Sequence, residues 1–570
     1  MGLIGRTGPE AVTRLSRLLA AHLGLCLLSV LALLFFVTYT LPTPYYLDTF
    51  GYVVWIQTYG EKGYFPSLYR LMNTYLYFYP VKLFGELGIK ITTVVVITCF
   101  TGCYYRLIQR DFSTPIAIMS TLILLSSPTT IISVTHLKED YTALLFLALA
   151  MLIGSKKSTV HSSLAGVAYG LSLLFKEATL AVFPCVLAYV YLPWHPQRTD
   201  IAPLWRDMRV WHAGRAMFLF LVGVCLIHFA IAPERYKDFF LMAGSPYTGQ
   251  FLGLFSQVQR RGYQFWQEAI LYLSPWYGVC LVSVGAAVWR RDAKRCLYFV
   301  AFLILFGVLS NTSVIRARHY APALLFLAPL CVDGVLVLGQ ALRRLLARRR
   351  LPSFGERQLA VACLLGVISL SGLQIAYVLP TLEYRLRYHP LKEFYGPLGS
   401  HLPADAMLLG MDNCLIASYF SRLPCVKHPV DLDQAAYAHF KHTVREALVT
   451  HPVFLIPDFF SYDATGVLKR RFEQDFQLKH VFSGLSENYH AMTYGPSARW
   501  VIAQMQRGFP ACHYASEEHR SVAASPRLTL LSVTYRFACG PDMLAEHFWI
   551  YKGHVTYLRQ QSIYQVQARS

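Results

Sequence analysis

Eleven apolar runs, most of them long enough to cross a bilayer, constrain the fold of this 570-residue chain more than any other feature. A helix of about 20 apolar residues crosses a hydrocarbon core roughly 30 Å thick. Backbone polar groups find no water inside that core, so a run placed there satisfies them within a helix. Only 15% of the residues are charged, whereas soluble domains average about 25%. The sequence therefore predicts an α-helical polytopic membrane protein with about eleven transmembrane helices.

The positions of these runs give the predicted spans. The first, 18–40, is longer than the apolar part of a cleaved signal peptide, so we interpret it as a retained helix. The others are 86–107, 114–134, 141–154, 160–175, 178–193, 214–232, 269–289, 296–311, 320–340 and 358–379. Run 141–154 is short for a complete crossing, and we expect its helix to extend into the flanking residues.

The distribution of positive charge predicts the orientation of the chain. The net charge is +20, and Lys and Arg gather in alternate short loops such as 156–157, 290–295 and 343–350. Loops of this kind stay in the cytoplasm. We therefore expect the inner (plasma) membrane, a cytoplasmic N-terminus and a C-terminal domain on the periplasmic or extracellular side. Nucleic acid is not an expected partner, because no basic patch lies in a soluble domain.

Composition divides the chain near residue 380. Residues 1–380 form the expected membrane module, with outer loops 41–85 and 233–268 that are rich in Tyr, Phe and Trp. Those rings suit an interfacial belt or contacts with a substrate, and both interpretations stay open. Residues 381–570 are predicted to form an extracytoplasmic, soluble α/β domain. Strands are predicted at 406–410, 424–428, 452–457, 529–536 and 548–558, and helices at 436–450 and 465–476.

Four of the 13 cysteines lie in this C-terminal region: Cys414, Cys425, Cys512 and Cys539. No pair of them has the spacing of a zinc site. If the domain faces an oxidising compartment, the four cysteines allow one or two disulfides. The sequence does not determine the pairing.

Charged clusters lie at the outer ends of the predicted spans, where charge near the bilayer is costly and often functional. The first contains Asp48, which follows the first span. A carboxylate there is placed to take a proton from an acceptor hydroxyl, and such help is worth about 10²–10⁴ in rate. Asp is equally a favoured N-cap, here for a helix that begins near Thr49, so two interpretations remain.

The second and third clusters lie at two other outer ends. Glu139 and Asp140 precede the run 141–154, where Asp140 also suits a helix cap. Lys176 lies between two spans that are joined by a minimal loop. Its ammonium group could extend to the headgroup layer or contact a phosphate, and both interpretations stay open.

The fourth cluster opens the span 320–340 and contains Arg316, Arg318, His319 and Tyr320. The rigid fork of donors in a guanidinium group suits phosphate oxygens. Basic residues on the outer side depart from the positive-inside tendency, which indicates an anionic partner such as a lipid phosphate. Together the clusters supply acids that activate an acceptor and cations that stabilise a phosphate leaving group.

The order of these clusters resembles the GT-C membrane glycosyltransferases, in particular the bacterial protein O-mannosyltransferase and aminoarabinose transferase group. Asp48 matches the essential Asp of the family's first outer loop, and Glu139-Asp140 before an aliphatic run is similar to its second acidic motif. The stretch 316–322 is similar to an Arg-x-x-Tyr-x-x-Pro element. The likeness covers roughly residues 15–340. Thr49 stands where many relatives have a second acid, so the base assignment rests on Asp48 alone.

This resemblance implies a GT-C fold, a polyprenyl-phosphate-linked sugar donor and an inverting reaction. The acceptor would be a lipid, a glycan or a protein. Asp48 would be the general base, and Asp140 or Glu139 would orient a substrate. The donor phosphate would be held by Lys176, Arg316, Arg318, His319 and Tyr320. Members with monophosphate donors generally work without a metal, so we expect no cofactor, with a divalent cation as the alternative.

Other classes of function compete with this hypothesis. A transporter or flippase places ionisable residues near the bilayer midplane and uses repeats, whereas these clusters lie at the outer edge and no repeat is visible. A polysaccharide polymerase similar to O-antigen ligases would share the outer arginines without requiring Asp48. In a structural scaffold every cluster would be a helix cap or an extended surface side chain.

Overall fold

The computed structural model describes residues 9–44, 47–57, 71–135, 137, 140–156, 158–191, 207–231, 278–310, 321–349, 355–411, 413–427, 434–460, 467–487, 513–525, 528–539, 542–551, 554–556 and 558–569. The chain divides into two compact units. The first comprises Met1–Thr43 and Trp55–Tyr377, and the second comprises Pro44–Val54 and Val378–Ser570.

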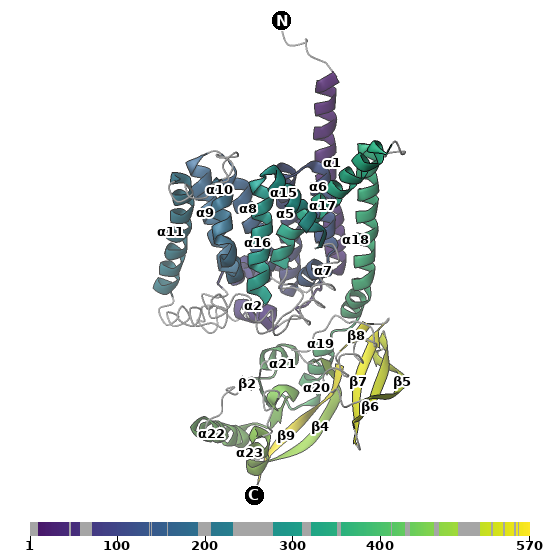
Figure 1. The fold of residues 1–570 in the computed structure, drawn as a ribbon. Coiled ribbons are helices and arrows are strands. Elements are labelled where there is room, and N and C mark those ends of the chain that lie inside the picture. Colours follow the sequence, from purple (N-terminus) through teal and green to yellow (C-terminus); the bar gives the residue numbers. More distant parts are fainter. Residues whose placement is uncertain are drawn as a thin grey trace. The chain divides into compact units, whose positions relative to one another are not determined.

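The first unit is a bundle of helices (Figure 1). In chain order its described elements are α1 (Pro9–Tyr39), α4 (Leu71–Phe84), α5 (Glu86–Asp111), α6 (Thr114–Ser126), α7 (Pro128–Thr135), α8 (Asp140–Gly154), α9 (Thr159–Phe175), the 3-10 helix η2 (Glu177–Val182), α10 (Phe183–Tyr191), α11 (Met208–Ile231), α15 (Cys280–Arg290), α16 (Ala293–Ser310) and α17 (Ala321–Arg348). Helix α18 (Glu356–Arg387) begins in this unit and ends in the second.

Every predicted span falls on one helix or on two consecutive helices, over the residues that the structure describes. Within those residues, five helices are long and apolar enough to cross a membrane, and six spans result if the bent pair α6 and α7 counts as one. Other apolar helices, including α8 and α9, are shorter. The first unit is therefore a helical membrane module.

The predicted span 114–134 is broken rather than continuous. Helices α6 and α7 meet at an angle of 59°. Ser127 between them is extended, with φ −58° and ψ 132°, and Pro128 follows it. The proline ring disfavours a helical conformation in the preceding residue, which explains the break.

Small residues let neighbouring helices of the bundle approach closely. A Cβ atom added to Gly166 in α9 would lie 2.1 Å from the carbonyl oxygen of Ala213 in α11. Close contact between helices through small residues is common in membranes, where packing replaces the hydrophobic driving force. Helix α9 packs against α8 as well, so it joins two neighbours of the bundle.

The second unit contains a five-stranded sheet with the order β2-β1-β3-β9-β4. Strand β1 (Met407–Gly410) is parallel to β2 (Cys425–Lys427) and β3 (Val453–Leu455). Strand β9 (Leu558–Ala568) is antiparallel to β3 and to β4 (Phe476–Glu487). These three short parallel strands lie within the strands predicted at 406–410, 424–428 and 452–457. The remaining described helices of this unit are α19 (Pro390–Tyr395), α20 (Leu398–His401), α21 (Cys414–Ser421), α22 (Gln434–Thr450), the 3-10 helix η8 (Pro457–Phe460) and α23 (Val467–Asp475).

A second, antiparallel sheet has the order β5-β6-β7-β8. Its strands are β5 (His513–Ser525), β6 (Leu528–Cys539), β7 (Asp542–Tyr551) and β8 (His554–Thr556). The predicted single strand 548–558 is wrong, because it contains the end of β7, all of β8 and the first residue of β9. Tyr551 pairs with His554 across antiparallel strands, so the chain reverses direction between them.

The segment Pro44–Val54, which follows the first span, is part of the second unit. It includes most of α2 (Leu47–Gln57). Phe50 is fully buried in an apolar cluster with Leu391 and Phe394 of α19. The Nε2 atom of His389 lies 3.0 Å from the carbonyl oxygen of Pro44. A buried ring and a hydrogen bond therefore hold the segment Pro44–Val54 against residues from far along the chain.

Candidate functional site

Two of the predicted site residues meet in an ion pair. The Nζ atom of Lys176 lies 3.1 Å from Oδ1 of Asp140. Asp140 is the first residue of α8, and Lys176 directly follows α9. The carboxylate is 3% exposed and the lysine side chain is 22% exposed. The start of α8 and the end of α9 are thus joined by a largely buried pair of opposite charges.

A third helix, α7, also contacts the carboxylate of Asp140. Ser133 of α7 donates a hydrogen bond of 3.0 Å to Oδ2 of Asp140. The break between α6 and α7 gives α7 a direction of its own. Each carboxylate oxygen therefore has a donor, and hydrogen bonds to an ionised group are stronger than those between neutral groups.

Hydrogen bonds fix the backbone at Lys176. Lys176 has an extended backbone between α9 and η2, with φ −152° and ψ 107°. The hydroxyl of Thr179 donates to the carbonyl oxygen of Lys176 at 2.8 Å. The hydroxyl of Tyr169 donates to the backbone carbonyl oxygen of Thr179 at 2.6 Å. Ser172 donates to the carbonyl oxygen of Ala143 at 2.8 Å, which ties α9 to α8. The lysine therefore extends from a turn that is held at several points.

The other predicted site residues fall partly or wholly outside the described part of the chain. Asp48 is the second residue of α2, so it lies in the first turn of a helix rather than at its N-cap. Its side chain is outside the described residues, as are Glu139, Arg316, Arg318, His319 and Tyr320. The structure thus brings Asp140 and Lys176 together, and Ser133 is a partner that the sequence reasoning missed.

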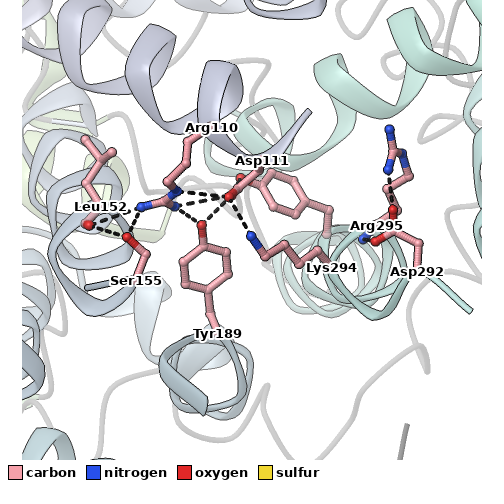
Figure 2. Close-up of polar contacts among 9 residues, drawn as sticks. Arg110, Asp111, Leu152, Ser155, Tyr189, Asp292, Lys294 and Arg295 are labelled. Atoms are coloured by element: carbon pink, nitrogen blue, oxygen red, sulfur yellow. Dashed lines mark hydrogen bonds and ion pairs between the residues drawn. The ribbon is translucent and has the colours of Figure 1, made fainter. Parts of the chain in front are cut away.

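A second polar cluster gathers around Asp111 (Figure 2). Asp111, the last residue of α5, has a fully buried side chain. It lies 3.1 Å from Nε of Arg110 and 3.2 Å from Nζ of Lys294, and it accepts hydrogen bonds from the hydroxyls of Tyr189 and Tyr298. The carboxylate at the end of α5 therefore binds a lysine and a hydroxyl from α16 and a hydroxyl from α10.

Arg110 extends this cluster toward the end of α8. Its Nη1 donates to the carbonyl oxygen of Leu152 at 3.1 Å and to the hydroxyl of Ser155. Because Asp140 begins α8 and Ser155 directly follows its end, the two clusters are separated by the length of this helix, about 20 Å at 1.5 Å per residue. The Asp111 cluster is therefore remote from the Asp140–Lys176 pair.

Arg295, in the first turn of α16, pairs with acids from α17 and from the short loop after α15. Its Nε lies 3.1 Å from Oδ2 of Asp333 in α17, and its guanidinium group also pairs with Asp292. Ser283 of α15 donates to Asp333 at 2.6 Å. The guanidinium group lies 4.8 Å from the centre of the Phe112 ring. Asp111 and Asp292 are single acids next to basic residues, and the pattern of these loops predicts only positive charge. Asp333 lies inside the predicted span 320–340.

The fold is similar to that of known membrane enzymes, although no family model and no curated protein matches the sequence. ArnT, an aminoarabinose transferase from Cupriavidus metallidurans, superposes in its apo state with a TM-score of 0.52 at 14% identity, over 80% of this chain and 95% of that one. Its structure bound to undecaprenyl phosphate gives a TM-score of 0.48 at 14% identity, with the same shares of both chains.

An archaeal enzyme gives a lower score. The oligosaccharyltransferase from Archaeoglobus fulgidus, tethered to an acceptor peptide, has a TM-score of 0.44 at 13% identity, over 80% of this chain and 72% of that one. The likeness to apo ArnT spans nearly the whole of ArnT and most of this chain. The chain therefore shares the fold of ArnT, a GT-C glycosyltransferase.

Proposed function

We propose that this protein is a membrane glycosyltransferase that moves a sugar from a polyprenyl-phosphate-linked donor to a lipid, glycan or protein acceptor on the extracytoplasmic face. The observation that carries the proposal is the GT-C fold shared with apo ArnT over 80% of the chain. Undecaprenyl phosphate is the lipid bound by ArnT itself. The ion pair between Asp140 and Lys176 adds to this support, because it unites two clusters that sequence reasoning assigned to one site.

In the proposed reaction Asp48 is the general base. It takes the proton of the acceptor hydroxyl while the oxygen forms a bond to the anomeric carbon of the sugar. The bond between that carbon and the phosphate oxygen breaks, and the polyprenyl phosphate leaves as an anion. A single displacement of this kind inverts the anomeric configuration, by analogy with inverting glycoside hydrolysis.

The leaving phosphate needs charge stabilisation rather than a proton. We assign this role to Lys176, Arg316 and Arg318, with His319 and Tyr320 as helpers. Fixed cations in a site that excludes water stabilise a developing anion without reorganising at the moment of reaction. Asp140 positions Lys176 through the 3.1 Å contact. Glu139, adjacent in sequence, is assigned to orienting a substrate.

The proposal includes a topology. About eleven helices cross the inner (plasma) membrane, the N-terminus is cytoplasmic, and residues 381–570 form an extracytoplasmic α/β domain. The disulfide between Cys414 and Cys425 supports this orientation, because disulfides persist in oxidising compartments such as the periplasm. The basic loops that contain Lys156 and 290–295 then lie on the cytoplasmic side.

We propose a reaction that needs no metal. A member with a monophosphate donor stabilises its leaving group with cationic side chains, whereas a diphosphate leaving group takes a divalent cation. Transfer that persists in the presence of EDTA is expected. Loss of transfer in EDTA that is restored by Mg²⁺ or Mn²⁺ would overturn this part of the proposal.

The test is an assay of the purified chain in liposomes with a panel of radiolabelled polyprenyl-phosphate sugars. Asp48→Asn is compared with wild type and with Asp405→Asn, which changes an exposed carboxylate of the second unit. We expect Asp48→Asn to lose at least about 10² in rate while it still binds donor, because a general base contributes about 10²–10⁴. Asp405→Asn should retain wild-type transfer.

Each contrary result points to a different error. An active wild type that is matched by Asp48→Asn rules out Asp48 as the base and favours a ligase-type mechanism that depends on Arg316 and Arg318. A wild type that neither transfers sugar from a lipid-phosphate donor nor binds one overturns the proposed function as a whole.

A further inference from the structure

A cavity of about 570 Å³ lies between the first turns of α6 and the first turns of α18. Ile118 and Met119 line it from α6, and Val361 and Leu364 line it from α18. Ligand sites in proteins have volumes of roughly 300–1,000 Å³. The cavity is thus large enough for a small molecule or for part of a lipid.

Among the described residues that line the cavity, one is charged. Arg357, in the first turn of α18, lines it together with the polar residues Ser113 and Thr114 that begin α6. All three lie at the same end of an otherwise apolar space. The Arg357 side chain is exposed, and it forms no ion pair with any residue that the structure describes. Apolar walls with a cation at one end match an amphiphile that has an anionic head and a hydrocarbon tail.

The neighbourhood of the cavity indicates where such an amphiphile comes from. Val361 is 49% exposed, and Leu365 and Ile368, one and two turns further along α18, are 59% and 50% exposed. Apolar side chains on a membrane-spanning helix that are exposed in the protein face the lipid chains. An acyl chain of the surrounding bilayer therefore has direct access to this side of α18.

Positive charge is concentrated just before this helix. Five arginines, Arg343, Arg344, Arg348, Arg349 and Arg350, precede Arg357 within one stretch of chain. Groups of four to eight basic residues next to a membrane-spanning helix attract anionic lipid headgroups. This attraction favours an anionic phospholipid over a neutral one.

We propose that this cavity is a binding site for an anionic phospholipid, with one acyl chain between α6 and α18 and the phosphate against Arg357. The site differs from that of the sugar donor. Helix α6 begins three residues after Asp111, so the cavity lies at the end of the bundle that is remote from Asp140 and Lys176. Lipid retention is measured without sugar transfer, so failure of this proposal and failure of the proposed function give different results.

The test measures lipid retained by the purified chain, without any sugar donor. The protein is reconstituted in nanodiscs of equal parts dioleoyl-phosphatidylglycerol and dioleoyl-phosphatidylcholine, extracted in mild detergent and analysed by native mass spectrometry. We expect wild type to retain phosphatidylglycerol preferentially. Arg357→Gln should lower that preference about fivefold, since one basic residue near the surface contributes about 1 kcal/mol. Ala360→Trp, which fills the cavity, should lower retention of both lipids.

Arg290→Gln is the matched control, because Arg290 is an exposed arginine in the last turn of α15 and does not line the cavity. Its retention should equal that of wild type. Equal retention of both lipids by wild type overturns the proposal, as does unchanged preference in Arg357→Gln. Full retention by a folded Ala360→Trp variant overturns the placement of the acyl chain in the cavity.

Discussion

The Nζ atom of Lys176 lies 3.1 Å from Oδ1 of Asp140, a carboxylate that is 3% exposed. The two residues come from loops that the sequence reasoning treated as separate clusters. A buried ion pair makes each partner depend on the other, because a charge left alone in a low-dielectric environment is strongly disfavoured. The pair therefore links the positioning of Lys176 to the packing of the start of α8 against the end of α9.

Asp140→Asn is expected to destabilise the protein by about 3–5 kcal/mol, the range for breaking a buried pair on one side. Lys176→Gln should have a cost of similar size. The double variant should cost less than the sum of the two, because residues in contact are not additive. Thermal unfolding in detergent measures all three, and transfer by the folded fraction should fall in each.

The control for this cycle is Glu473→Gln. Its carboxylate is 44% exposed and lies 3.9 Å from Nζ of Lys469. An exposed pair of this kind contributes about 0–1 kcal/mol. Simple additivity of Asp140→Asn and Lys176→Gln would contradict the interdependence of the pair.

Asp111→Asn is expected to destabilise the protein by about 3 kcal/mol or more, because it removes the one carboxylate between Arg110 and Lys294. Tyr189→Phe deletes the hydrogen bond that the hydroxyl donates to that carboxylate and the one that it accepts from Arg110, and it should cost about 1.5–3 kcal/mol or more. Unfolding by denaturant gives both values. The transfer rate per folded molecule should stay at the wild-type level in both variants, since the cluster is remote from the proposed site. A selective loss of rate without loss of stability would refute a structural role.

Removal of the Cys414–Cys425 disulfide should destabilise the second unit by about 3 kcal/mol. The bridge joins α21 to β2 with a sequence separation of 11, and closing a loop of that size restricts the unfolded chain by roughly that amount. The double variant Cys414→Ser/Cys425→Ser is compared with Cys296→Ser, which changes a free cysteine of the first unit. Circular dichroism of the β signal during heating reports the difference. An unfolding temperature that equals the control would show that the bridge does not restrict the unfolded chain.

The spans could be predicted from the sequence because hydrophobicity is a local property of each run. The bend at Ser127 and Pro128 is also local, and it follows from the restriction that proline places on the preceding residue. The Asp140–Lys176 contact could be anticipated only as two residues at one end of the bundle. Which residue pairs with each charge depends on how the helices pack, and that packing cannot be predicted from the local pattern of one sequence.

The strands show the same division. Strand β1 is short and apolar, so its pattern identified it. Strand β4 mixes Lys479 and Ser483 with apolar residues, and it is held by pairing with β9 from the end of the chain. Such pairing is a long-range property, which explains why β4 was not predicted as a strand.

Asp475→Asn should flatten the loss of stability that the second unit shows in acid. Burial opposes ionisation of Asp475, but hydrogen bonds from Lys441 and Tyr437 outweigh it and hold its pKa below the ordinary value. A carboxyl with a lowered pKa in the folded state stabilises the fold above its unfolded pKa of about 3.9. That contribution is lost as the pH falls through the folded pKa. Wild type should therefore lose more stability than Asp475→Asn between about pH 5 and pH 3, as measured by urea unfolding of the full chain. Asp405→Asn, an exposed carboxylate, should follow the wild-type curve, and equal slopes for wild type and Asp475→Asn would refute the role of this hydrogen-bonded carboxylate.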